Sequence, residues 1–183
     1  MREKFQKREK PEFEQRLVDI ARVTRVMAGG KRLRFRACVV IGDMNGRVGW
    51  GIAKGADVSI AINKAVSKAK KQMITVNIYK NTIAHEVKKK FKSALIYLKP
   101  APVGRGVIAG GVVRDVMELA GIKDIIAKMY GSNSKINNVR ATFEALSELR
   151  LIEDKKSDSE EKVLEKSEPV LLEDMKKEDK KEE

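Results

Sequence analysis

The chain has 183 residues, of which 42% are hydrophobic and 36% charged, so it can form one domain or two small ones with a core. Its formal net charge is +13, but residues 151–183 hold 13 acidic and 8 basic side chains, which leaves +18 on residues 1–150. A body this basic favours a polyanionic partner and is unusual for an ordinary enzyme.

The N-terminal half predicts three strands followed by a helix. Residues 1–13 alternate charges with few apolar positions and are expected to form a flexible basic arm. A first strand is expected over residues 17–27. A second is expected over residues 33–41, where apolar side chains at every second position share one face. Arg34 and Arg36 fall between these positions and must point the other way.

A turn at residues 43–46 leads to a returning strand over residues 48–52. Gly49 and Gly51 interrupt its alternation, where their small size allows a bulge or a close backbone approach. From Asp57 the apolar period becomes helical, and the lysines of this segment fall on a separate stripe. A small sheet covered by such a helix is a suitable platform for a phosphate backbone.

The second half predicts a compact β-β-α-β-α unit after an extended link at residues 74–79. The expected elements are strands over 85–91 and 93–98, a loop over 103–110, a helix over 112–120 closed by Gly121, a strand over 125–129, a loop over 131–137 and a helix over 139–149. The fold class is therefore α+β with two small domains, over residues 14–75 and 76–150. Residues 151–183 are too polar to offset ordering entropy and predict a disordered tail.

Several spaced motifs run in order through residues 14–149. They are Gly42-Asp43, Gly46 and Val48-Gly49 within the run 30–62, then KPAP at 99–102, GRGVIAGG at 104–111, YGS at 130–132 and NVRAT at 138–142. Together they resemble the signature of the bacterial small-subunit ribosomal protein S5 family. The resemblance implies a first domain similar to double-stranded-RNA-binding domains. It also implies ribosomal RNA and ribosomal proteins S4 and S8 as partners, a position near the side where messenger RNA enters, and an influence on translational accuracy.

Cations of the first domain, together with Lys135 of the second, form the predicted RNA-binding surface, because lysine and arginine neutralise phosphates. The candidate contacts are Arg22, Arg25, Lys31, Arg32, Arg34, Arg36, Lys54, Lys64, Lys68, Lys71 and Lys135. By resemblance, the loop at residues 29–32 reaches ribosomal RNA near the head and neck of the subunit. Phe35, Trp50 and Tyr79 are candidates to stack on bases, but we expect them in the core.

A glycine-rich loop at residues 104–109 fits the G-x-G-x-x-A pattern of dinucleotide sites. Prolines precede it where a buried strand is needed, and Asp124 follows a helix rather than a second strand, so the match is weak. A loop before a helix can still hold a phosphate of RNA or pack against a protein. By resemblance this region lies near ribosomal protein S4, which makes Gly104, Arg105 and Arg114 candidates for a partner-protein or RNA contact.

The sequence offers few residues suited to catalysis. His85 is the only histidine, and the only cysteine, Cys38, lies in a strand, where it excludes an intrachain disulfide and fits a structural thiol. Asp43 is expected to bond backbone amides of its turn, and Asp115 and Glu118 to form a solvated helix face. We therefore predict no catalytic residue, metal site, cofactor or small-molecule substrate.

Two alternatives remain open at this point: a free-standing RNA-binding or RNA-modifying factor, and a cofactor-dependent enzyme using the glycine loop. No apolar run approaches the ~20 residues of a membrane helix, and no apolar signal-peptide core follows the N-terminus. We expect a cytoplasmic protein of the small ribosomal subunit with no membrane partner.

Overall fold

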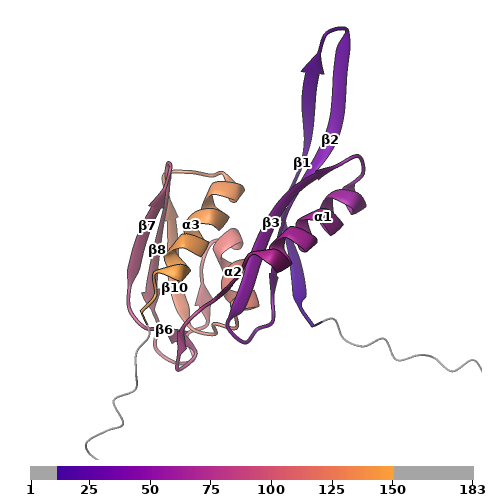
Figure 1. The fold of residues 1–183 in the computed structure, drawn as a ribbon. Helices are drawn as coiled ribbons and strands as arrows, with labels where there is room; N and C mark the ends of the chain where they lie inside the picture. The colour runs from indigo at the N-terminus through magenta and orange to yellow at the C-terminus, as the bar shows by residue number, and fades with distance from the viewer. Residues whose placement is uncertain (1–11, 151–183) are drawn as a thin grey trace, which may run out of the picture. The chain divides into compact units, whose positions relative to one another are not determined.

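The computed structural model describes residues 12–150, so nearly all of the predicted arm and the whole predicted tail lie outside the described residues. Within this range the chain is α+β, with a sheet-rich N-terminal part followed by a C-terminal part in which helices pack on a second sheet (Figure 1). The predicted fold class is confirmed.

The N-terminal sheet is antiparallel, with strand order β1-β2-β3-β4. Its elements are β1 (Glu14–Met27), β2 (Gly30–Gly42), β3 (Arg47–Gly55), the helix α1 (Val58–Lys71) and β4 (Met73–Thr75). The segment at residues 74–79, predicted as a link, thus begins with a short strand that pairs with β3. Such a short strand depends on its partner rather than on its own sequence, which explains why the pattern did not reveal it.

Helix α1 packs closely on one face of this sheet, because glycines on the strand meet alanines on the helix. A Cβ atom built on Gly49 or Gly51 would overlap the backbone of α1 at Ala69 or Ala65. Both alanines are fully buried. The glycines therefore serve a close backbone approach, one of the two uses predicted for them.

The C-terminal sheet has the strand order β7-β8-β10-β9. After the small hairpin of β5 (Ile78–Tyr79) and β6 (Thr82–Ile83), the elements are β7 (Val87–Phe91), β8 (Ala94–Pro100), β9 (Val107–Ile108), α2 (Gly111–Ala120), β10 (Ile125–Tyr130) and α3 (Lys135–Ser147). Strand β9 lies inside the predicted loop and pairs in parallel with β10. Helix α3 begins four residues before the predicted Val139, because three of the four residues of its first turn are polar and hide the apolar period.

One hydrophobic cluster continues from the N-terminal sheet into the C-terminal part. Cys38, Val40 and Val48 belong to it together with Val116 and Met117 of α2. These strand residues lie on the face opposite α1, so the N-terminal sheet is covered on both faces where the two parts meet.

Backbone hydrogen bonds reinforce the same junction. The amides of Met44 and Gly46, in the β2–β3 turn, donate to the carbonyls of Leu119 (3.1 Å) and Ala120 (2.9 Å) at the end of α2. Gly121 follows with φ +87°, which confirms the predicted helix end. The turn thus caps the last carbonyls of α2, which would otherwise lack partners.

Candidate nucleic-acid interface

The β1–β2 hairpin continues beyond the sheet as a two-stranded ribbon. Pairing of β2 with β3 ends at Phe35 and Gly55, whereas pairing of β1 with β2 continues to Met27 and Gly30. We call residues 20–36 the ribbon; its projection past β3 is visible in Figure 1. It contains six arginines and lysines and no acidic residue.

Strand register assigns the cations of the ribbon to two faces. Residues directly opposite each other in an antiparallel pair share a face. Arg25 lies opposite Arg32, and Arg36 lies opposite both Ala21 and Lys54. We call the face of the sheet away from α1 the outer face. It carries five cations: Arg25, Arg32, Arg34, Arg36 and Lys54.

The remaining predicted contacts of this half lie on the other side. Arg22 and Lys31 share the ribbon face that continues into Ala37 and Val39, on which α1 packs. The lysines of α1 are exposed: Lys64, Lys68 and Lys71. The cations that the sequence suggested as one surface thus occupy two faces of the sheet, because alternate residues of a strand point to opposite sides.

Five of the six cations of the ribbon form no ion pair with the residues that the structure describes, a property that they share with Lys64, Lys68 and Lys71 of α1. Within residues 12–150, Arg16, Arg47, Lys89 and Arg140 all form ion pairs. Over the same range the structure records no ion pair for five exposed ribbon residues: Arg22, Arg25, Lys31, Arg32 and Arg34. A phosphate can therefore approach these side chains without displacing a carboxylate of the described residues.

Asp19 links the outer face to the start of α3. It lies where β1 shifts register against β2, between Leu17 and Asp19. One carboxylate oxygen is 3.5 Å from Nη2 of Arg36 and the other is 3.5 Å from Nζ of Lys135. The predicted contact Lys135 thus lies beside the outer face although it is 99 residues from Arg36 in sequence.

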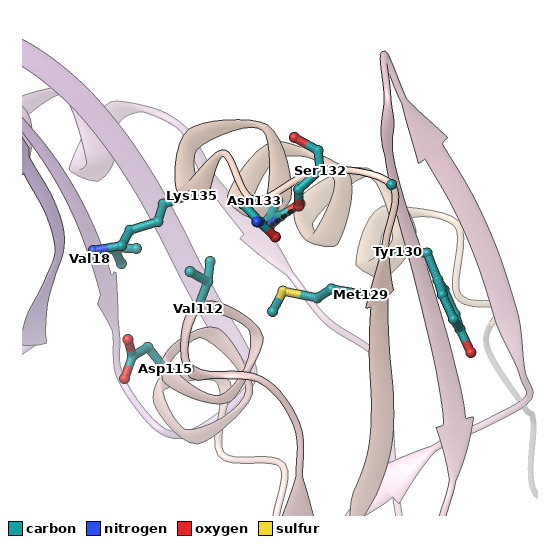
Figure 2. A pocket seen from close by; sticks show the side chains of 11 residues that line it. Val18, Val112, Asp115, Met129, Tyr130, Ser132, Asn133 and Lys135 are labelled. Carbon is teal, nitrogen blue, oxygen red and sulfur yellow. Dashed lines mark hydrogen bonds between the residues drawn. The ribbon is translucent and has the colours of Figure 1, made fainter.

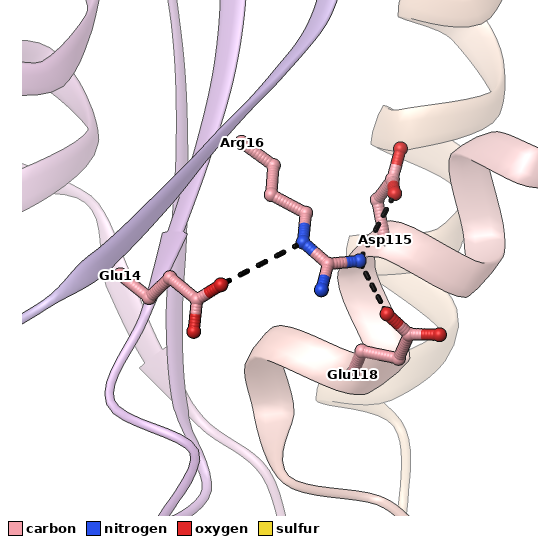
Figure 3. A network of polar contacts seen from close by, with 4 residues as sticks. All are labelled: Glu14, Arg16, Asp115 and Glu118. Atoms are coloured by element: carbon pink, nitrogen blue, oxygen red, sulfur yellow. Dashed lines mark hydrogen bonds and ion pairs between the residues drawn. The ribbon is translucent and has the colours of Figure 1, made fainter.

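A second charged cluster joins β1 to α2 (Figure 3). Nη1 of Arg16 is 3.3 Å from a carboxylate oxygen of Asp115 and also pairs with Glu118, while Nε lies 3.9 Å from Glu14. Hydrogen bonding to Glu118 raises the pKa of the Arg16 guanidinium above its ordinary value, although burial opposes it. The expectation that Asp115 and Glu118 form a solvated helix face is wrong, because Arg16 occupies both carboxylates.

Asp124 holds the glycine loop in place. Its carboxylate is the one that would have to bind the ribose if the loop held a dinucleotide. The amide of Gly106 donates to Oδ1 of Asp124 at 2.8 Å, and Asp124 is buried. Arg105 in the loop and Arg114 on α2 are both exposed. Val103, which is 80% exposed, adds an apolar side chain to this loop.

Three other candidate residues, Trp50, Asp43 and Cys38, have structural roles in packing or in a turn. The ring centroids of Trp50 and Phe143 are 6.1 Å apart, which places Trp50 against the core as expected. Oδ1 of Asp43 accepts hydrogen bonds from the amides of Asn45 (2.8 Å) and Arg47 (3.0 Å), as the turn predicted. Cys38 is 1% exposed, and burial together with the Asp19 charge raises the pKa of its thiol to about 11.

Residues 12–150 lack two kinds of feature. No helix there is long and apolar enough to cross a membrane. No group of three or more His, Cys, Asp or Glu side chains in that range is arranged to hold a metal ion.

The fold and the ribbon define a small, strongly basic α+β protein with a projecting hairpin that carries cations and no acidic residue. Two family models match it: the N-terminal domain of ribosomal protein S5 over residues 13–77 and the C-terminal domain of ribosomal protein S5 over residues 89–159. The chain therefore belongs to the ribosomal protein S5 family and is a protein of the small ribosomal subunit. Association with ribosomal RNA and other ribosomal proteins is general to this family.

Proposed function

We propose that this chain binds small-subunit ribosomal RNA through the ribbon and the outer face, and thereby stabilises the local RNA fold. The observation that carries the proposal is the ribbon itself, with six cations, no acid and five side chains without an ion pair among the described residues. Neutralising phosphates releases counterions, which drives association at moderate salt. The exposed lysines of α1 supply a second contact for the same RNA.

Phosphate and shape readout dominate in this proposal. Trp50, Phe35 and Tyr79 are all half-buried, and Trp50 and Phe35 pack against the hydrophobic clusters, so few aromatic faces are free to stack on bases. Arginine side chains on a twisted ribbon instead follow a phosphate backbone, which positions the protein without reading sequence.

The glycine loop and the start of α2 form the proposed contact with a neighbouring ribosomal protein, S4, with S8 as a further partner. Val103 and Ile108 are exposed apolar side chains, and Arg105 and Arg114 flank them with charge. A surface that mixes apolar and arginine side chains is typical of protein interfaces. Coupling RNA to these partners near the side where messenger RNA enters is how the chain would influence translational accuracy.

Binding to small-subunit ribosomal RNA over a range of salt concentrations tests this proposal. The triple variant Arg25→Ala, Arg32→Ala, Arg34→Ala should bind at least about 10-fold more weakly at moderate salt. It should also flatten the plot of log affinity against log salt by roughly two, because each lost phosphate contact removes about 0.7–0.9 from the slope.

A matched control instead removes three cations from β7 and the turn after it, with Lys88→Ala, Lys90→Ala and Lys92→Ala. If both triple variants lose the same affinity and the same slope, the charge of the whole molecule rather than the ribbon accounts for binding. The proposal then fails.

A further inference from the structure

A pocket of about 560 Å³ lies where β1, α2, β10 and α3 meet (Figure 2). Val18 of β1, Val112 of α2 and Met129 of β10 supply apolar walls, while the side chain of Tyr130 points away to the other side of β10. Ser132 and Asn133, in the loop before α3, add polar groups. This volume suits a small organic ligand rather than a single ion.

Asn138 lines this pocket and holds a buried acceptor that has no donor among the described residues. The residue is 2% exposed, and its Nδ2 donates to the carbonyl of Ser132 at 3.1 Å, which orients the side-chain amide. Its Oδ1 is buried and has no hydrogen-bond partner among the described residues. Because an unsatisfied buried acceptor is costly, a ligand that offers an N–H or O–H group here gains more than an ordinary hydrogen bond.

Two helix N-termini also meet at the pocket. Gly111 is the first residue of α2 and Lys135 the first residue of α3, and both line the pocket. Neither helix has a side-chain cap hydrogen bond or an acidic residue in its first turn. Free amides at helix starts attract anions, and Lys135 adds a positive charge that is paired with Asp19 among residues 12–150.

We propose that the pocket binds one unpaired nucleotide of the RNA strand held on the outer face; this rests on the proposed function. The phosphate lies toward the helix starts and Lys135, the base lies against Val18, Val112 and Met129, and a base or ribose donor satisfies Asn138. Asp115 also lines the pocket, but its carboxylate is already held by Arg16.

The position of the pocket favours RNA as the source of this nucleotide. Asp19 bridges Arg36 of the outer face and Lys135 of the pocket, so a strand that follows the arginines arrives at the pocket directly. A base can enter only when it is unstacked, as bases in loops and bulges are.

The variant Gly111→Leu tests the pocket without disturbing the fold. Gly111 is exposed, a Cβ atom there meets nothing within 4 Å, and leucine favours helix. By contrast, Asn138→Ala would remove the bond to Ser132 as well. Ser147→Leu, which adds the same side chain at the exposed end of α3, is the control.

The first measurement is a titration of the isotope-labelled full chain with AMP, CMP, GMP and UMP, followed by NMR. At least one nucleotide should shift the Asn138 side-chain amide and the amides of residues 132–135 with saturation. The Gly111→Leu variant should lose this shift and the Ser147→Leu variant should keep it. The absence of a saturable shift with all four nucleotides overturns the proposal. So does an equal shift with inorganic phosphate alone, which would indicate only an anion site.

The second measurement shows whether the pocket binds a nucleotide of RNA rather than a free nucleotide. It also distinguishes failure of the pocket proposal from failure of the proposed function. Gly111→Leu should weaken binding to small-subunit ribosomal RNA by roughly fivefold to tenfold, the worth of one or two hydrogen bonds, with the salt slope nearly kept. If wild type and this variant bind RNA equally, the pocket proposal is wrong while RNA binding by the ribbon stands. Loss of RNA binding in the wild type itself would instead reject the proposed function.

Discussion

Gly121 is one of the residues at which the backbones of the two parts of the chain approach closely. It has φ +87°, and a Cβ atom there would overlap the carbonyl of Met44. Left-handed backbone is costly for alanine, and the overlap adds a clash with backbone that carries two junction hydrogen bonds.

Gly121→Ala should therefore lower the free energy of unfolding by about 3 kcal/mol or more, measured by urea denaturation. Gly111→Ala is the matched control, because that glycine begins the same helix and has open space around it. We expect the control to be neutral or slightly stabilising. Equal losses in both variants would contradict the importance of the junction.

The Cys38 thiol provides a chemical probe of the same junction. Its pKa is raised to about 11 by burial and by the charge of Asp19. At pH 8 this lowers the thiolate fraction by about 100-fold, so the folded protein should react with a thiol reagent only through opening of the structure. Rapid reaction at native conditions, at the rate of the unfolded chain, would show that Cys38 is not buried in solution.

The raised pKa of Cys38 also determines the direction in which pH changes the stability of the fold. Because folding raises the pKa of Cys38, the folded state binds the proton more tightly, and its contribution to stability is fully present below the ordinary thiol pKa. That contribution should be lost as pH rises toward about 11. A Cys38→Ala variant should show a smaller loss of stability between pH 8 and 11.

Single residues were predictable where local pattern determines them and unpredictable where distant partners do. The alternation of strand β2 predicted that Arg34 and Arg36 face away from the apolar positions on which α1 packs, and the register confirms it. The pairing of Arg16 with Asp115 and Glu118 spans about a hundred residues, so nothing local indicated it. The unpartnered oxygen of Asn138 depends in the same way on the surrounding fold.

The ribbon is an element whose role separates cleanly from folding. No residue between 22 and 34 belongs to either hydrophobic cluster of the described structure. Core packing therefore does not determine the sequence of the ribbon, which is consistent with a role in binding.

Replacing residues 24–33 by an Asn-Gly turn should shorten the ribbon without harming the sheet. Val23 and Arg34 are directly paired, as Met27 and Gly30 are at the natural turn, and Asn-Gly suits such two-residue turns. We expect the melting temperature to stay within about 3 °C, while affinity for small-subunit ribosomal RNA is largely lost. A large drop in melting temperature would show that the ribbon supports the fold.

Elements were recognised from sequence when they were long and periodic. Strands β1 and β2 and the helices α1 and α2 were predicted at nearly their observed bounds. The short strands β4 and β9 were not, because two or three residues carry no measurable period and gain their hydrogen bonds from β3 and β10. The apolar run from Ala37 to Ile41 did contain a signal for burial on both faces, since a half-exposed strand would alternate with polar residues throughout.

At the scale of the whole molecule, the two parts share one hydrophobic cluster rather than meeting through a polar boundary. Strand residues Cys38, Val40 and Val48 are buried against α2, and Met117 of that helix is fully buried in the same cluster. An isolated segment of residues 14–75 would expose this face to water. The two family domains are thus expected to fold as one unit, although each matches a separate family model.

We therefore predict a single unfolding transition for residues 12–150, with equal calorimetric and van't Hoff enthalpies. Met117→Ala, which leaves a cavity on the C-terminal side of the junction, should cost about 2–5 kcal/mol. By hydrogen exchange it should lower the protection of core amides in β2 as much as in β10. Two separate transitions, or a loss of protection confined to β10, would show that the parts fold independently. The covered face of the N-terminal sheet would then be a contact that forms after folding and not a part of the core.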